Sequence, residues 1–527
     1  MQSVDAMCGI LFVDTSSEAA AGRTRVEQAG ACLRHRGPDA SRTAFVKHHA
    51  LVFHRLAIMG TGDGMEGGGM QPFFTPSGGV AMVCSGEVYN FEELRGGGAA
   101  PRSDVDVVLT LLAEVLSDVG EVAGRVARLD GDFAFVVTDG AQVVAGRDPF
   151  GVRPLFYAAD GAGRIVALAS EAKALFSLCG VGGGAKVRVF PPGHVLVNGE
   201  ISRYYVYGDG GVTDCCAFRG LLERAVEKRV LHSERPVGVL CSGGVDSAVI
   251  TALAARLQKK VHVFTMRYSG NGRSDDAFYA TLMCERLGLR HTVVTFDAAD
   301  FGAIPEVVAA LETCDPNTIR AALPMYLLAR HIAAHTDIKV VLSGEGADEL
   351  LGGYGYIRFA PSALEAAAES DRLLGNLHMF DLLRADRCFA AFGLEVRVPF
   401  LDADLVRRGV PSSCRMPDGR GVEKSLLRDS FAHLDELQAC RILERPKEKF
   451  SDGTGFCYVP DLLRHLAAGN DDGTLKTRLA AEAAHYAHIY AALYGAPDLV
   501  VERRLPEWGE AERRKRGDDA IGLSGAI

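Results

Sequence analysis

The alternation of apolar and polar positions divides the chain into two parts. From Cys8 to about Tyr205, short runs of apolar and β-branched residues are separated by turn residues, which predicts mostly antiparallel strands. Two stretches repeat their apolar residues at helical spacing instead. We therefore expect a layered α+β domain in which a few helices cover the sheets. The predicted strands are 9–13, 50–58, 80–84, 133–137 and 194–197, and the predicted helices are 25–35 and 105–116.

The pattern changes beyond a glycine-rich segment at 207–211. Apolar runs that suit buried parallel strands then alternate with helical patterns, which predicts a doubly wound α/β domain. In such domains ligands bind beyond the carboxyl ends of the strands. After Leu350 the pattern is mostly helical. The predicted strands are 237–240, 261–264, 292–295 and 339–342, and the predicted helices include 248–257 and 321–331.

These patterns predict three units along the chain. An α+β domain is expected at 8–205, and an α/β domain with a helical C-terminal part at 212–500. The remaining segment, 501–527, mixes acidic and basic residues and is expected to be a flexible tail. The glycine-rich stretch 60–69 lacks the strand and helix that a phosphate loop requires, so we interpret it as a surface loop.

Composition narrows the class of protein. A chain of 527 residues is too long for a single core. Its net charge of −10 disfavours nucleic acid or an anionic membrane as a partner. The 13 cysteines show no repeated CxxC spacing, so we expect neither a disulfide framework nor a zinc site. No apolar run approaches the roughly 18 residues that span a bilayer, and no secretory signal is visible. The expected location is the cytoplasm.

The strand predicted at 237–240 leads into Ser-Gly-Gly-Val-Asp-Ser at 242–247 and then into a helix. Glycines allow backbone N–H groups to approach a polyphosphate, and a helix N-terminus favours the anion. Asp246 would suit such a loop if a divalent cation lay between its carboxylate and the phosphates. The alternative is an ordinary βα turn, but six specified positions favour a phosphate site.

A second strand end carries a similar group of residues, Ser-Gly-Glu-Gly-Ala-Asp-Glu at 343–349. Acidic residues there could simply complement the N-terminus of a helix. Two matched loops at the ends of two strands of one sheet favour a shared binding site instead.

With both loops the chain resembles the class B, glutamine-hydrolysing asparagine synthetases, up to about Pro497. The resemblance implies an αββα layered N-terminal nucleophile domain, which acts as a glutamine amidotransferase, fused to an ATP pyrophosphatase-type α/β synthetase domain. Further matching motifs are Pro-Met-Tyr-Leu at 324–327, His-Met-Phe-Asp at 378–381, the segment 393–402 and the segment 445–453.

The resemblance implies a reaction in which aspartate attacks ATP, pyrophosphate leaves with the help of Mg²⁺, and ammonia from glutamine attacks β-aspartyl-AMP. Asp246 and Asp348 are expected to hold the metal, and Lys447 to stabilise charge on the phosphates. Arg320 would contact the aspartyl group or the phosphate, and Glu345 would take the proton from ammonia. The remaining residues implied for ATP binding are Leu240, Ser242, Gly243, Gly244, Ser247, Met266, Ser343 and Gly344.

Cys8 begins the other predicted site. Alone it would more often be a small core residue, but Arg-His-Arg-Gly-Pro-Asp at 34–39, His-Arg-Leu-Ala-Ile at 54–58 and Gly-Glu-Val-Tyr-Asn at 86–90 also match the family. By resemblance the Cys8 thiol attacks the glutamine amide and its own free α-amino group is the base. Arg55 would hold the glutamine carboxylate and Asp104 its α-ammonium group. The pocket would also include Leu56, Ala57, Ile58, Met59, Ser85, Gly86 and Glu87.

Two positions depart from the family pattern. Six residues precede Met7, although Cys8 must be first in the mature chain, so either translation starts at Met7 or a short propeptide is cut. Ser85 stands where the family has an Asn that helps to hold the oxyanion, and losing such a donor costs about 10²–10³ in rate.

Three functions remain open on the sequence. The first is glutamine-dependent asparagine synthesis. A variant of it is a synthetase that uses only free ammonia because its glutaminase half is weak. The second is a related amide-forming ligase with another carboxylate acceptor, although relatives that use an internal amine usually lose the Cys that this chain keeps. The third is a non-enzymatic interaction module, against which the intact acidic residues and Lys447 argue. The oligomeric state stays open, with a homodimer as one option.

Overall fold

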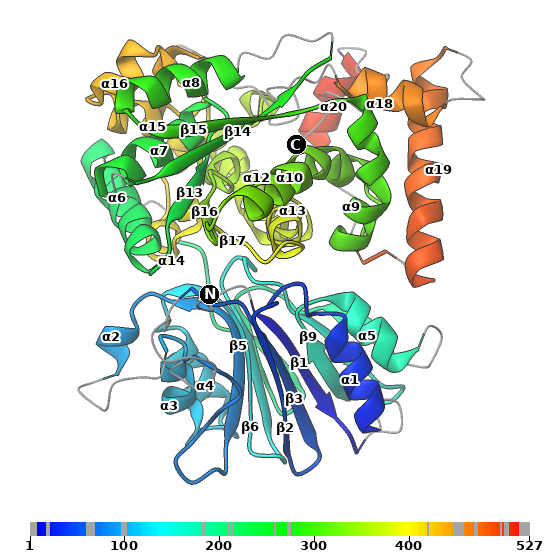
Figure 1. Ribbon diagram of the computed structural model, residues 1–527. Coiled ribbons are helices and arrows are strands. Elements are labelled where there is room, and N and C mark those ends of the chain that lie inside the picture. Colours follow the sequence, from blue (N-terminus) through cyan, green and yellow to red (C-terminus); the bar gives the residue numbers. More distant parts are fainter. Residues whose placement is uncertain are drawn as a thin grey trace.

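The computed structural model (Figure 1) describes residues 8–16, 22–58, 69–95, 103–180, 185–208, 211, 214–257, 260–270, 276–418, 421–445, 458–467, 473–495, 498–499 and 505–515. Within these residues, the segment up to 208 forms one body and the segment from 211 onward forms another, called here the first and second parts. Figure 1 shows the first part below the second. None of the described helices is long and apolar enough to cross a bilayer.

Two antiparallel sheets form the first part, with the strand orders β10-β8-β9-β1-β3-β2 and β12-β11-β7-β6-β5-β4. The antiparallel prediction is therefore confirmed. The strands are β1 (Gly9–Asp14), β2 (Ala40–Val46), β3 (His49–Arg55), β4 (Phe73–Phe74), β5 (Ala81–Val88), β6 (Gly131–Thr138), β7 (Val143–Arg147), β8 (Phe156–Ala159), β9 (Ile165–Ala169), β10 (Lys186–Val189), β11 (His194–Val197) and β12 (Glu200–Arg203).

Side-chain alternation along β1 shows how the sheets are layered. Ile10 and Phe12 pack into a cluster that also contains inner-face residues of the second sheet. Leu11 and Val13, one residue out of step, pack instead against helices. The two sheets thus lie face to face with helices outside them, because successive side chains of a strand point to opposite faces. The helices of this part are α1 (Arg23–Ala31), α2 (Phe91–Leu94), α3 (Asp106–Leu112), α4 (Val119–Val126) and α5 (Ala172–Cys179).

The second part is built on a parallel sheet with the order β15-β14-β13-β16-β17, which confirms the parallel prediction. Its strands are β13 (Val237–Leu240), β14 (His262–Tyr268), β15 (Arg290–Phe296), β16 (Val340–Leu342) and β17 (Glu395–Arg397). The sequence gives no sign of β17, because two of its three residues are charged. Their charges are accommodated by buried ion pairs, including a contact of 2.6 Å between Arg397 Nε and Glu395 Oε1.

Helices surround this sheet and extend beyond it. They are α6 (Cys215–Leu231), α7 (Val245–Leu257), α8 (Asp276–Leu287), α9 (Ile304–Leu311), α10 (Pro316–His335), α11 (Ala347–Leu351), α12 (Ala363–Asn376), α13 (Asp381–Ala390), α14 (Ala403–Arg408), α15 (Ser425–Ser430), α16 (Asp435–Ala439), α18 (Tyr458–Leu466), α19 (Leu475–Tyr494) and α20 (Glu507–Lys515). Short 3₁₀ helices are η2 (Ala298–Ala303), η3 (Ile357–Phe359), η4 (Leu377–Met379), η5 (Pro399–Leu401), η6 (Ser412–Arg415) and η7 (Ile442–Glu444).

Capping explains why α10 is longer than the predicted segment 321–331. The Asp315 side chain accepts a hydrogen bond from the Thr318 backbone, and Pro316 takes the first helical position. Both residues are favoured at a helix N-terminus, so the helix begins before its apolar pattern does. Helix α3, by contrast, is shorter than the predicted segment 105–116: it ends at Leu112, although the apolar pattern continues to Leu116.

The segment expected to be a tail is partly folded. Helix α20 lies within it, and the ring of Trp508 lies 5.8 Å from the ring of Tyr356, just before η3. Residues 507–515 are thus helical, whereas 501–504 and 516–527 lie outside the described residues. The loop predicted at 60–69 also lies almost entirely outside them.

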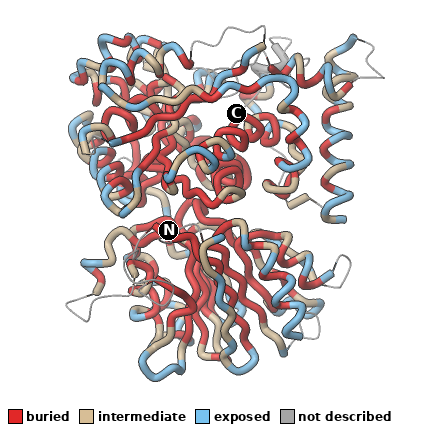
Figure 2. Tube along the Cα trace, in the orientation of Figure 1, coloured by how far each residue is buried: buried red, intermediate tan, exposed pale blue. Residues whose placement is uncertain are grey.

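Charged side chains are buried where the two parts meet, a region that Figure 2 colours largely as buried. Arg36 binds Asp386 through both carboxylate oxygens, at 2.8 and 3.0 Å. Arg229 crosses in the other direction and lies 3.3 Å from Asp132. Removing one partner of such a buried pair is strongly destabilising, because a charge is left without compensation. The ion pairs thus fix how the two parts sit on one another.

Candidate functional site

Cys8 lies at the start of β1, with its side chain in the core between the two sheets of the first part. Burial raises the pKa of the thiol well above its usual range, although a hydrogen bond with the Leu56 backbone opposes the shift. The thiol is therefore protonated at neutral pH, and a nucleophilic role requires a base beside it. In the uncut chain the nitrogen of Cys8 is part of a peptide bond with Met7 and cannot serve as that base.

The carbonyl group of Cys8 is held from two sides. Ser85 Oγ donates a hydrogen bond to this oxygen at 2.7 Å, and Arg36 Nε donates another at 3.4 Å. The sequence predicts Ser85 as a weak substitute for an oxyanion donor, whereas in the structure its hydroxyl positions Cys8. Gly86 follows with φ of 124°, where a Cβ atom would lie 1.9 Å from the Asp132 carbonyl oxygen, so only glycine fits.

The segment after β3 runs alongside Cys8, because Gly9 pairs with His54 in the antiparallel register. Arg55 is 2 % exposed at the end of β3. Leu56 and Ile58 pack into the two main cores of the second part. The predicted glutamine pocket is thus anchored in both parts, and the Ala57 N–H donates to Asp39 at 3.0 Å. Met59 lies outside the described residues.

Glu87 and Asp104, both predicted for the pocket, lie together with His232 at the end of α6 in the second part. His232 Nε2 lies 3.1 Å from Glu87 Oε2 and 3.5 Å from Asp104 Oδ2. Arg397 of β17 lies 3.2 Å from the other Glu87 oxygen. The sequence analysis missed His232, and no local motif marks it, because only the fold brings α6 to this pocket.

The two predicted phosphate loops follow β13 and β16, which are neighbouring parallel strands in which Val239 pairs with Leu342. Ser247 Oγ accepts a hydrogen bond from the Ser242 N–H at 3.1 Å and donates one to the Gly244 carbonyl oxygen at 3.2 Å, so the first loop closes on itself. A Cβ atom on Gly344 would lie 3.2 Å from the Asp246 Cβ, so the loops are in close contact. Gly243 has φ of 72°, in the region that favours glycine.

The other residues predicted for the nucleotide lie at the same edge of the sheet. Leu240 is the last residue of β13, Ser343 directly follows β16, and Met266 lies in the neighbouring strand β14. The Cys241 carbonyl oxygen accepts a hydrogen bond at 2.6 Å from Thr265 Oγ1, which fixes the end of β13 relative to β14.

Lys424 joins the two aspartates that were predicted to bind a metal. Its Nζ atom lies 2.6 Å from Asp246 Oδ2 and 2.5 Å from Asp348 Oδ1, and the lysine is fully buried. Two convergent carboxylates are a fitting donor set for Mg²⁺, which prefers oxygen ligands. The sequence analysis missed Lys424, since it comes just before α15, far from both loops along the chain.

Glu345 pairs with Arg384 of α13, whose Nη2 lies 2.5 Å from Glu345 Oε1. Burial raises the pKa of Glu345, although Arg384 opposes the shift. The same helix α13 carries Asp386, which binds Arg36 beside Cys8. One helix therefore contacts residues of both predicted sites.

The Arg320 guanidinium group forms a buried ion pair with Glu482 of α19, in which Nε donates to Glu482 Oε1 at 2.7 Å. Lys447 lies outside the described residues. The preceding Arg445 is described, and its Nη1 donates to the Ser242 carbonyl oxygen at 3.3 Å. Arg445, two residues before Lys447, is therefore hydrogen-bonded to the first loop.

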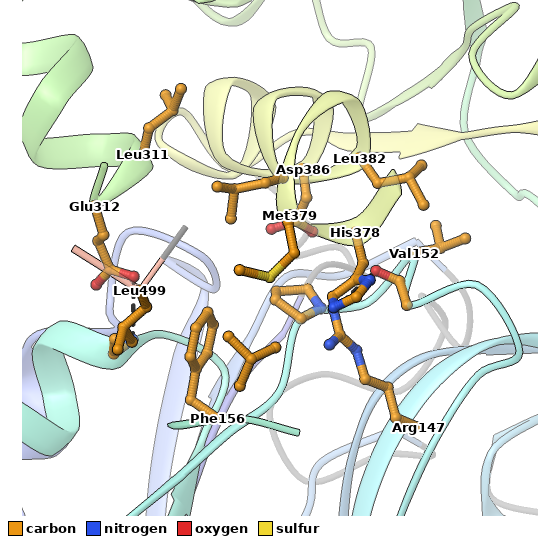
Figure 3. Close-up of a pocket in the computed structure, with 15 residues that line it drawn as sticks. Arg147, Val152, Phe156, Leu311, Glu312, His378, Met379, Leu382, Asp386 and Leu499 are labelled. Carbon is orange, nitrogen blue, oxygen red and sulfur yellow. Dashed lines mark hydrogen bonds between the residues drawn. The ribbon is translucent and has the colours of Figure 1, made fainter. Parts of the chain in front are cut away.

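A separate cavity lies between the two parts, and Figure 3 shows side chains of both parts around it. Its lining is mostly apolar and contains none of the predicted glutamine or ATP residues. Lining residues include Arg147, Phe156, Leu311, His378, Met379 and Leu382.

Comparisons with known proteins agree over most of the chain. A family model described as asparagine synthase matches residues 217–372 and 362–512, and one described as a glutamine amidotransferase domain matches 7–193. The chain is 36 % identical to the asparagine synthetase [glutamine-hydrolyzing] of Gallus gallus over 91 % of its length and 93 % of that protein. It is 34 % identical to the protein of the same name from Mus musculus, over 90 % of its length and 92 % of that protein. The chain belongs to the family of glutamine-hydrolysing asparagine synthetases.

Proposed function

We propose that the protein makes asparagine from aspartate with ATP and with ammonia that it releases from glutamine. The observation that carries this proposal is the contact of two glycine-rich loops at neighbouring parallel strand ends, with Asp246 and Asp348 directed at one cation, Lys424. This is the arrangement that a polyphosphate with a divalent cation requires. The relatives named above, which match over nine tenths of the chain, support the same reaction.

The first part is proposed to act as the glutaminase, an N-terminal nucleophile domain at 8–205. Cys8 attacks the glutamine amide carbon, and its α-amino group, once free, accepts the thiol proton. The hydrogen bonds from Ser85 and Arg36 to the Cys8 carbonyl oxygen fix the residue in place. Arg55 binds the substrate carboxylate, and Asp104 and Glu87 bind its α-ammonium group.

The second part is proposed to act as the synthetase, an ATP pyrophosphatase-type domain at 212–500. Backbone N–H groups of the loop 242–247 and the N-terminus of α7 bind the phosphates. Asp246 and Asp348 would hold Mg²⁺, which neutralises charge on the leaving pyrophosphate. Glu345 accepts a proton from ammonia, and its raised pKa suits that role. We further propose that the enzyme works in the cytoplasm.

One assay tests the proposal. The protein is incubated with ATP, Mg²⁺, aspartate and either glutamine or ammonium, and asparagine, AMP and pyrophosphate are measured together. Asparagine and pyrophosphate should appear in equal amounts with both nitrogen donors. The variant Cys8→Ala should make asparagine from ammonium alone. Consumption of ATP without asparagine, or with another carboxylate only, would contradict the proposal.

A further inference from the structure

His232 is held rigidly at the junction of the two parts. It caps the C-terminal end of α6, where a helix favours positive charge. Its ring lies edge-on to Tyr89 and to Phe91, with 5.5 Å between ring centroids in each case. Its backbone carbonyl oxygen accepts a hydrogen bond from Arg397 at 2.6 Å. These contacts hold the ring so that Nε2 lies 3.1 Å from Glu87 Oε2 and 3.5 Å from Asp104 Oδ2.

The groups that face this ring favour its protonated form. Burial by itself lowers the pKa of His232, but the close contacts with Asp104 and Glu87 and the charges of both outweigh burial and raise the pKa to about 9. The pKa of Asp104 is lowered, since contacts with His232 outweigh the effect of burial. Burial raises the pKa of Glu87, with the Asp104 charge adding to the shift. Arg397 stays charged, since its pKa is raised. Tyr89 stays neutral, because burial raises the pKa of its phenol.

At neutral pH an imidazolium that belongs to the other part of the chain thus lies beside the Asp104 carboxylate and the Glu87 carboxyl group. An imidazolium N–H and an α-ammonium group are both cationic donors, and both form charge-assisted hydrogen bonds with carboxylates. Glu87 and Asp104 are the residues to which the proposed function assigns the α-ammonium group of glutamine. With the imidazolium in place, the α-ammonium group would have to share Glu87 and Asp104 with a second buried cation, and the two positive charges would repel one another.

We propose that the His232 imidazolium occupies the α-ammonium subsite of the glutamine pocket, so that glutamine binds only when the ring loses its proton or leaves Glu87 and Asp104. This inference rests on the proposed function of the first part. His232 is then a residue of the synthetase part that sets the affinity of the glutaminase part for its substrate. The chain runs from His232 into β13 and the first phosphate loop, so one continuous segment would contact both glutamine and ATP.

The decisive variant is His232→Gln, which removes the charge and keeps a hydrogen-bonding side chain. The KM for glutamine is measured in the glutaminase reaction between pH 6.5 and 9.5 for the wild type and the variant. At pH 7 the KM of the variant should be roughly tenfold to a hundredfold lower, since a contact with a charged group must be given up before glutamine binds to the wild type. The sign follows from the raised pKa: the competing imidazolium is present below pH 9 and is lost above it, so the two KM values should converge as pH rises.

Titration of the amino group of glutamine affects both proteins equally and cancels in their ratio. The matched control is His433→Gln, which changes an exposed histidine of the same part and should leave the ratio at one. His232→Asn serves as a second neutral variant in case His232→Gln does not fold. A KM that is equal to or higher than that of the wild type across this pH range, in an active glutaminase, would overturn the inference.

Calorimetry separates this inference from the proposed reaction. Glutamine is titrated into Cys8→Ala protein with and without His232→Gln, in buffers with different ionisation enthalpies. Binding should release more protons at pH 7 when His232 is present than when it is replaced. If glutamine binds with this proton release but no asparagine is made, the reaction proposal fails and the inference stands. If neither protein binds glutamine, the inference falls, since the subsite is then not a glutamine site.

Discussion

The carbonyl oxygen of Cys8 is the most constrained atom of the first predicted site. Ser85 and Arg36 both donate to it, and Arg36 is itself fixed by Asp386 and by Glu171, whose Oε1 lies 2.8 Å from Arg36 Nη1. A nucleophile must be placed within a fraction of an ångström of its productive position. The pair of hydrogen bonds provides that placement through the backbone of Cys8.

The variant Ser85→Ala tests this placement. Loss of one hydrogen bond of about 1 kcal/mol should lower the kcat of the glutaminase roughly fivefold. Ammonia-dependent synthesis should not change, because its residues lie in the second part. Steady-state rates with the two nitrogen donors give the answer, with Ser177→Ala as a control at an exposed serine of α5. An unchanged glutaminase rate would show that Arg36 alone suffices.

Glu345 and Asp246 should fail at different steps. On the proposed mechanism Asp246→Asn blocks adenylation, whereas Glu345→Gln still permits β-aspartyl-AMP to form and blocks its reaction with ammonia. Aspartate labelled with oxygen-18 in its side-chain carboxylate transfers label to AMP once adenylation has been followed by amide formation or hydrolysis. Labelled AMP without asparagine is expected for Glu345→Gln and no labelled AMP for Asp246→Asn. Equal loss in both would place Glu345 in the adenylation step.

The sequence predicts residues that belong to a local motif and misses those that act from elsewhere. Cys8, Glu87 and Asp246 were identified because each lies in a recognisable run. Lys424 and His232 were missed, although each lies within about 3 Å of a predicted residue. Both come from segments far along the chain, and only tertiary packing brings them to the sites.

At the scale of elements, α13 is the helix that contacts both predicted sites. Arg384 binds Glu345 of the synthetase site, and Asp386 binds Arg36 beside Cys8. After Asp381 every residue of α13 is buried, charged and apolar alike. The contacts of α13 with both sites are made by the charged ends of Arg384 and Asp386, which the periodicity of the helix does not predict.

The variant Asp386→Asn should destabilise the protein. Arg36 would keep Glu171 but lose a partner that it binds through two oxygens, and breaking a buried pair costs about 3–5 kcal/mol. Urea denaturation should show this loss, and glutamine-dependent synthesis should fall more than ammonia-dependent synthesis. Asp404→Asn, at an exposed aspartate of α14, is the control. Wild-type stability of Asp386→Asn would mean that Glu171 alone balances Arg36.

Strand β14 carries a histidine that should weaken the fold in acid. Burial is the main cause that lowers the pKa of His262 to about 4, and the ring lies 4.0 Å from the Phe264 ring. The unfolded chain binds this proton near pH 6.5, so stability is lost as the pH falls from about 6.5 to about 4. Urea midpoints for His262→Gln should fall less steeply over this range than those of the wild type. His48→Gln, at an exposed histidine, should behave like the wild type.

At the scale of the whole molecule, the two parts share buried charges and apolar packing. Arg397 contacts Glu87, Arg229 contacts Asp132, and Leu56 of the first part packs in a core of the second. Neither part could be separated without leaving charges buried and unpaired or exposing them together with apolar surface. Composition and periodicity predict two sheets of different type, but they contain no information about this shared surface.

Thermal unfolding should therefore be cooperative between the parts. Differential scanning calorimetry is expected to show one transition for the wild type, since each part is stabilised by the other. Arg229→Met, which removes a contact between them, should broaden or split that transition. Arg23→Met, which removes an exposed pair with Glu27 on α1, should not. Two well-separated transitions in the wild type would contradict this coupling.

The packing of α20 gives the molecule an optical probe. Trp508 is the only tryptophan in the chain, so all indole fluorescence comes from the point where α20 meets Tyr356. Tyr356 lies near Tyr354, whose hydroxyl donates to Glu349, the residue after Asp348. Emission from Trp508, excited at the red edge of protein absorption, therefore reports on whether α20 is docked beside the segment that carries Asp348. No label needs to be introduced to follow it during turnover.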